Sequence, residues 1–158
     1  MTIGRPYTAQ FTAVAVTAQQ DFFEIVAPAD ACVELLEFHL SQSTEVGDTA
    51  EEGLSVLLKS GSTVSGSGGS SVTPVPLSLG DAAFGGTCEA NNTTKANTGT
   101  IVTHGAWNWN IRIPLDVIFT PETCKILSPS ARLTVELGTT PADSVTVSGY
   151  AVFKEIGG

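Results

Sequence analysis

Residues 105–121, GAWNWNIRIPLDVIFTP, constrain the fold more than any other stretch of this 158-residue chain. Large apolar side chains occupy the odd positions, and most of the polar ones occupy even positions. A period of two residues is typical of an extended strand with one face in a core. We therefore expect this stretch to carry the heart of a β core, with one apolar face made by Trp107, Trp109, Ile111, Ile113, Leu115, Val117 and Phe119.

Pro114 falls on the polar face of this stretch. Proline cannot donate a hydrogen bond to a neighbouring strand, so it is confined to sheet edges and bulges. The sequence therefore predicts an edge strand, or a bulge where one long strand bends between two sheets.

Shorter alternating segments occur along the rest of the chain. In the first of them the apolar face switches near Ala13, which indicates a bulge or a strand covered on both sides. Residues 77–83 could form a short helical turn, and no longer helix is predicted. Further strands are expected over residues 7–17, 22–27, 32–42, 54–60, 125–127, 132–138 and 145–156.

About eight to ten antiparallel strands separated by turn signals predict an all-β sandwich or barrel. The length fits a single domain over residues 1–158. Long polar connections occupy most of residues 60–100, and the Gly/Ser-rich part should be exposed and extended. Such connections favour a jelly-roll β-sandwich over a simple meander. Loops longer than a connection requires are usually functional.

Composition excludes several classes of protein. Hydrophobic residues make up 42% and charged residues 15%, which is too apolar for disorder, and no apolar run is long enough to span a membrane. The net charge of −9 predicts repulsion from phosphate backbones, so neither nucleic acid nor membrane is an expected partner. The first ten residues lack a secretion signal, which predicts synthesis in a cytoplasm and three free cysteines, Cys32, Cys88 and Cys124.

Residues for catalysis or metal binding do not cluster in the sequence. His39 and His104 are the only histidines and are far apart, so surface or interface positions are favoured over a metal site. The acidic run from Glu45 to Glu52 lacks the spacing of a calcium loop. No serine lies in a nucleophile elbow, and the Gly-Ser-Gly-Gly stretch lacks the Lys and helix of a phosphate loop. We expect no enzyme activity, no catalytic residue, no cofactor and no metal.

Several segments together resemble one family. SQSTEVGDTAEEG, a following strand, GSGG, a pair of prolines, DAA and EANNTT occur in that order, and PADSVTVSG opens the last strand. This pattern covers most of the chain and is similar to that of jelly-roll capsid decoration (cement) proteins of tailed bacteriophages.

The resemblance implies a non-enzymatic virion protein, made in the host cytoplasm, that decorates and stabilises the capsid exterior. The partners it implies are the major capsid protein and further copies of this chain, in a homotrimer over capsomer junctions. From loop length and composition we expect contacts from residues 44–52, 61–76 and 90–99, with residues 1–6 as a possible arm. The contact residues predicted are Thr44, Glu45, Asp48, Glu51, Glu52, Ser65, Gly68, Ser71, Asn91 and Asn92.

Two alternatives remain open. A carbohydrate- or receptor-binding jelly-roll module of a virion fibre or tail requires an exposed aromatic platform or a groove lined by carboxylates. Trp107 and Trp109 could form such a platform, although their phase with Ile111 favours the core. A jelly-roll enzyme would require a metal in the purified protein.

Overall fold

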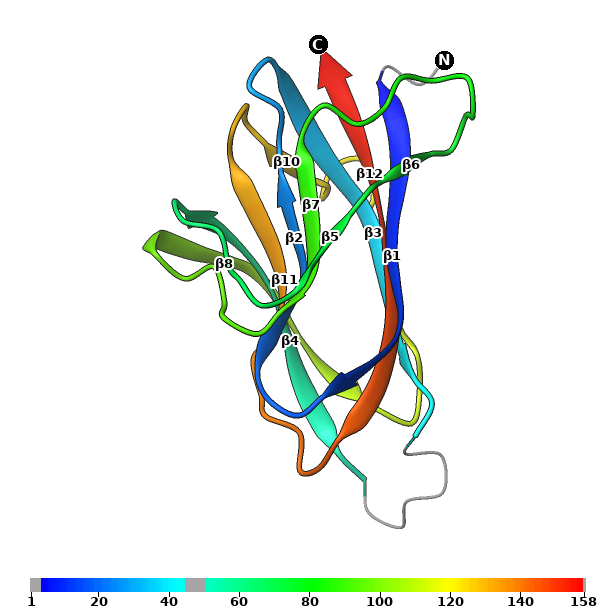
Figure 1. Cartoon of the computed structure of the whole chain (residues 1–158), viewed down its shortest axis with the longest axis vertical. Helices are drawn as coiled ribbons and strands as arrows, with labels where there is room; N and C mark the ends of the chain where they lie inside the picture. Colours follow the sequence, from blue (N-terminus) through cyan, green and yellow to red (C-terminus); the bar gives the residue numbers. More distant parts are fainter. Residues whose placement is uncertain (1–3, 45–50, 158) are drawn as a thin grey trace.

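A computed structural model describes residues 4–44 and 51–157 of the chain. Within these ranges the chain forms twelve strands and no helix. The strands build two antiparallel six-stranded sheets that pack face to face as an elongated sandwich (Figure 1). The predicted all-β sandwich is therefore confirmed, and three of the twelve strands have three residues or fewer.

The first sheet contains the first and the last strand of the chain. Its strands run in the order β10-β3-β12-β1-β6. Both β9 and β10 pair with the outer edge of β3, each along a different part of it. The longest pairing joins β12 to β3, and β1 lies on the other side of β12. The members are β1 (Arg5–Val16), β3 (Ala31–Gln42), β6 (Val75–Pro76), β9 (Leu115–Ile118), β10 (Lys125–Leu127) and β12 (Val145–Gly157).

The second sheet has the order β5-β7-β2-β11-β4-β8. Its two edge strands differ in length, since β5 has three residues and β8 has twelve. The members are β2 (Gln20–Val26), β4 (Gly53–Ser62), β5 (Ser70–Val72), β7 (Thr87–Asn92), β8 (Gly99–Asn110) and β11 (Arg132–Leu137).

Successive long strands alternate between the sheets. The chain passes from β1 in the first sheet to β2 in the second, returns to β3, and crosses again to β4. It crosses from β8 to β9, and β11 and β12 again lie in different sheets. This alternation is compatible with a jelly roll, and the jelly-roll topology in particular stays a prediction.

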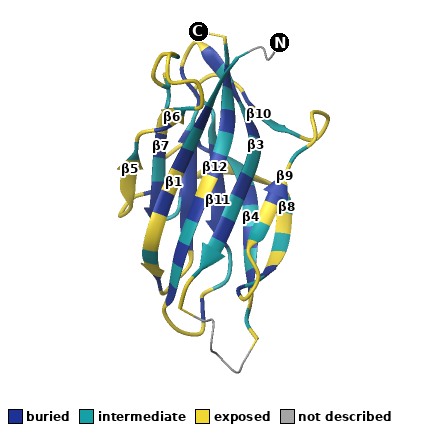
Figure 2. Ribbon diagram, turned by 90° about the vertical axis from the view of Figure 1, so that its right-hand side faces the viewer, coloured by how far each residue is buried: buried dark blue, intermediate teal, exposed yellow. Residues whose placement is uncertain are grey.

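The core lies between the two sheets. Buried and less buried residues alternate along strands such as β12 (Figure 2). Tyr7 and Phe153 stack with ring centroids 6.1 Å apart, and Phe11 lies 5.2 Å from Phe23 by the same measure. These aromatic side chains are at most 9% exposed. Burial of such side chains contributes about 2 to 3 kcal/mol each, so this interface dominates the stability of the sandwich.

The predicted bend in the Trp stretch is confirmed. β8 ends at Asn110 in the second sheet, and β9 begins at Leu115 in the first, so Pro114 lies in the turn between them. Trp109 is 2% exposed, and its indole N–H donates to the carbonyl of Ile113 at 2.7 Å. The predicted core position of Ile113 is wrong: its side chain is 64% exposed because the turn breaks the alternation.

The bulge predicted near Ala13 is also confirmed. The pairing of β1 with β12 shifts between Phe11 and Val14, and Ala13 has a φ of 54°. The Ala13 N–H donates to the hydroxyl of Ser148 at 2.9 Å instead of to a strand carbonyl. The short helical turn expected over residues 77–83 is wrong, because these residues form bends and one turn closed by the Asp81 N–H and the Ser78 carbonyl.

Candidate partner-contact surfaces

The outer face of the second sheet carries charged side chains that are nevertheless buried. Asp21 and Glu24 of β2 are each 1% exposed, and Glu136 of β11 is 2% exposed. A buried charge is costly unless ion pairs and hydrogen bonds satisfy it. The loops around residues 62–69 and 93–98 cover this face and supply many of those partners.

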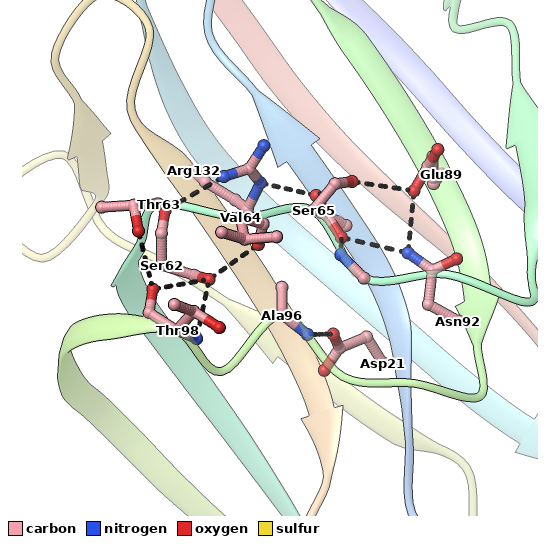
Figure 3. A network of polar contacts seen from close by, with 12 residues as sticks. Asp21, Ser62, Thr63, Val64, Ser65, Glu89, Asn92, Ala96, Thr98 and Arg132 are labelled. Atoms are coloured by element: carbon pink, nitrogen blue, oxygen red, sulfur yellow. Dashed lines mark hydrogen bonds and ion pairs between the residues drawn. The ribbon is translucent and has the colours of Figure 1, made fainter.

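Glu24 accepts four hydrogen bonds. Three of the donor residues, Ser65, Asn92 and Arg132, are labelled in Figure 3. One carboxylate oxygen accepts from the Ser65 hydroxyl at 2.7 Å and from Arg132 Nε at 2.5 Å. The other accepts from the Gly66 N–H at 2.8 Å and from Asn92 Nδ2 at 3.0 Å. Two of the four donors belong to the Gly/Ser-rich loop, so Glu24 fastens that loop to the sheet.

Glu136 fastens the second loop. Its carboxylate pairs with Lys59 of β4 at 2.8 Å and with Lys95 at 2.9 Å. Lys95 also donates to the side-chain oxygen of Gln19 at 2.9 Å. The loop that follows β7 is thereby held against β4, β11 and the turn before β2.

Asp21 contributes a third attachment. One of its oxygens accepts the Ala96 N–H at 2.7 Å, and the other is buried with no hydrogen-bond partner. Burial raises the pKa of the Asp21 carboxyl to about 7; the Ala96 N–H opposes this rise, and the nearby charges of Glu136 and Glu24 add to it.

The Gly/Ser-rich loop is thus an integral layer of the domain. Ser62 and Gly66 are buried, and Ser67 forms a backbone bridge with Thr94. A Cβ on Gly66 would lie 2.6 Å from the Thr94 carbonyl oxygen, so only glycine fits at that position. The prediction of an exposed, extended loop holds for most of residues 61–76 and fails at positions such as Ser62 and Gly66, because polar groups on distant strands hold these two against the sheet.

The predicted contact residues fall into two separate groups. In the first, Ser65, Gly68 and Ser71 are exposed over the second sheet. Asn91 and Asn92 are buried instead: Gln20 Nε2 donates to Asn91 Oδ1 at 2.8 Å, and Asn92 donates to Glu24 and Glu89. Because their side-chain amides form these buried hydrogen bonds, neither asparagine belongs to the proposed contact surface.

The second group lies at the end of the sandwich opposite the C-terminus (Figure 1). The Thr44 hydroxyl accepts the Thr146 N–H at 2.9 Å, and the Glu52 carboxylate accepts the Ala142 N–H at 2.6 Å. Glu51 is exposed beside them. Glu45 and Asp48 lie outside the described residues, and the structure does not bring this end together with the Ser65 group.

The two histidines lie apart. His39 on β3 stacks on Tyr150 of β12, with ring centroids 5.1 Å apart, and its Nδ1 is 2.5 Å from Asp116 Oδ1. His104 on β8 contacts the Ser60 hydroxyl at 2.7 Å, and burial and the charge of Lys125 lower its pKa. Across residues 4–44 and 51–157 no three His, Cys, Asp or Glu side chains group so that they could hold a metal ion.

Sequence reasoning missed one aromatic surface. Tyr150 is 37% exposed on the outer face of the first sheet, beside a shallow hollow of about 250 Å³. Hydroxyl and amide side chains, including Gln10 and Ser148, line the hollow. Tyr150 falls on an even position of β12, opposite in phase to the buried Val147, Ala151 and Phe153, so the alternation of this strand was the signal that could have placed it outward.

Comparisons of the chain with protein-family models, with curated proteins and with solved structures found no match. In the part of the chain that the structure describes, no helix is long and apolar enough to cross a membrane.

Proposed function

We propose that this chain is a structural protein of a tailed-phage virion that decorates and stabilises the outside of the capsid. The observation that carries the proposal is the position of two segments of the family pattern, GSGG and EANNTT. They are more than twenty residues apart in the sequence, yet Ser67 bridges Thr94, and the Gly69 N–H donates to Asn92 at 3.2 Å. The two segments of the pattern therefore lie side by side in one folded unit.

A preformed surface supports the proposed role. Ser67, Gly68 and Ser70 are exposed on a layer whose underside is fixed by Glu24 and Asn92. Docking of ordered loops costs less conformational entropy than docking of loops that must first become ordered. The proposed partners are the major capsid protein and, in a homotrimer over capsomer junctions, two further copies of the chain; the proposed role is non-enzymatic.

Binding to undecorated shells tests the proposal. The shells would be assembled from the major capsid protein of the phage that encodes this chain, and bound protein would be measured by co-sedimentation. We expect Ser70→Trp and Glu51→Lys to weaken binding at least tenfold, because each blocks one proposed contact region. Ser128→Trp and Glu122→Lys are matched controls at exposed positions elsewhere. No binding by the unmodified chain would refute the role.

Point substitutions are preferable to deletion of residues 65–71. That deletion would remove Ser65 and Gly66, two of the four donors to Glu24, and would leave a buried carboxylate short of partners. The oligomeric state is a separate measurement: sedimentation equilibrium of the free protein should give about three times the 16.3 kDa chain mass for a trimer formed before docking.

A carbohydrate- or receptor-binding module is the second candidate, and Tyr150 favours it. An exposed ring beside hydroxyl and amide groups is a common arrangement for sugar stacking. The tryptophans are less suited, since Trp109 is buried and Trp107 packs edge-on against Phe38 at 5.4 Å. Titration calorimetry with a panel of monosaccharides would detect binding, and any binding that Tyr150→Ala leaves unchanged would exclude this site.

A further inference from the structure

Most sheet edges in the described part of the chain are short. β5 and β10 have three residues each, β6 has two and lies beside Pro74, and β9 has four and follows Pro114. Lys125 in β10 and Asp116 in β9 add charges. Short strands, prolines and charged side chains are the usual means by which proteins prevent an edge from pairing with another chain.

The edge formed by β8 has none of these protections. β8 has twelve residues, and among the described residues it pairs with β4 alone. Its sequence, GTIVTHGAWNWN, contains no Asp, Glu, Lys, Arg or Pro. His104 is the one ionisable side chain of β8, and burial and the charge of Lys125 lower its pKa. A long, uncharged edge of this kind is a template for strand addition.

The half of β8 nearest the bend is the more regular. Gly105 to Asn110 pair without interruption with Gly53 to Leu58, whereas the register shifts beyond Leu58. Six residues at about 3.4 Å each give a straight edge of roughly 20 Å. Ala106 and Asn108 are exposed along it.

The inward side of this edge is apolar and incompletely covered. Trp107 is half-buried, and its ring packs against Phe38 and, with centroids 6.4 Å apart, against the half-buried Phe119. The ring also lies over Gly105, where a Cβ would approach it to 2.4 Å. A strand placed next to β8 would cover the rest of Trp107 with an apolar side chain.

A second copy of the chain fits this edge poorly. A stable dimer buries about 800 Å² on each partner, and a straight edge of roughly 20 Å supplies only a small part of that area. An extended segment of a partner needs no such area of its own, because it can add its pairing to contacts made elsewhere on the same body.

We propose that β8 binds an extended, uncharged segment of the shell protein by strand addition, with apolar side chains at alternate positions facing Trp107. This inference rests on the proposed attachment to a capsid and names how the partner is held. The open N–H and C=O groups of β8 supply affinity, and the Trp107 side supplies selectivity for the segment.

Lysine substitutions on the edge test this proposal with the same undecorated shells. Ala106→Lys and Asn108→Lys place a charge on exposed positions of β8, as natural edges do, and should leave the melting temperature unchanged. We expect each to weaken shell binding at least tenfold. Thr87→Lys, an exposed position of the interior strand β7, is the control and should bind normally. Hydrogen exchange should show slower exchange of β8 amides on the shell.

The outcomes separate this proposal from the function on which it rests. If the unmodified chain binds shells and both β8 variants bind equally well, with unchanged β8 exchange, strand addition is refuted and the capsid role stands. If the unmodified chain does not bind shells, both are refuted. If sedimentation shows self-association that Ala106→Lys abolishes, the edge pairs with a second copy and the proposal is overturned.

Discussion

Substitution of Asp21 by Asn should change how the stability of the protein depends on pH. The Asp21 carboxyl is 1% exposed, and only one of its oxygens has a hydrogen-bond partner. Asn keeps the shape of the side chain and an oxygen for the Ala96 N–H, and it removes the ionisation. Any pH dependence that disappears in Asp21→Asn therefore belongs to this carboxyl.

The sign follows from the direction of the pKa change. The folded pKa is about 7, and the ordinary value is 3.8, so between these values the folded chain holds a proton that the unfolded chain has released. The stabilisation is present in full below about pH 4 and is lost as the pH rises toward 7. Between pH 5 and pH 7 this loss extends over about two pH units, which corresponds to roughly 3 kcal/mol of unfolding free energy.

Urea unfolding followed by tryptophan fluorescence measures the effect, since Trp109 is buried in the core. Relative to the unmodified protein, Asp21→Asn should gain about 2 to 3 kcal/mol in unfolding free energy between pH 5 and pH 8. The difference between the unfolding free energies of the two proteins cancels the titration of groups common to both. Asp30→Asn, at an exposed position, should show no such gain. An equal stability difference at pH 5 and pH 8 would refute the assigned ionisation.

Three further outcomes are expected from the fold. Glu24→Ala should lower the unfolding free energy by about 3 to 5 kcal/mol, because Arg132 loses its partner in a buried site; a change under 1 kcal/mol in urea unfolding would contradict this. Ala13→Gly should raise the unfolding free energy by about 0.5 kcal/mol, since the φ of 54° strains alanine more than glycine; a lower urea midpoint would count against it. Cys88 should resist iodoacetamide at pH 8 in the folded protein, because burial raises the pKa of its thiol to about 12; mass spectrometry that finds Cys88 modified as fast as Cys32 would disprove this.

The fold was largely predictable because strand periodicity is a local property. Alternation placed Trp109 and Val117 in the core, and the position of Pro114 marked the change of sheet. The same rule overestimated the burial of Trp107, because a residue on an edge strand has neighbours on one side only. It also failed for Ile113, because a turn sets side-chain direction without regard to the two-residue period.

The loop-covered face could not be predicted, since its cause is spread along the chain. Glu24 meets Ser65 and Arg132, which are far from it in sequence, and no local pattern links the three. A buried strand reading QDFFEIV, with two carboxylates among its apolar residues, was the available signal that something must cover its polar face. Composition alone marked the covering loop as solvent-exposed.

The closure of the long excursion between β4 and β8 has a consequence for engineering the protein. The Thr63 N–H donates to the Thr98 carbonyl at 2.7 Å, and Ser62 pairs with Gly99, so residues 64–97 leave and re-enter the sheet at adjacent points. The two ends of the excursion are therefore held together by backbone pairing. The excursion also supplies β5 and β7 of the second sheet and β6 of the first, so its removal would uncover β2. Foreign peptides inserted at its exposed bends over residues 78–80 would leave the order of the strands unchanged.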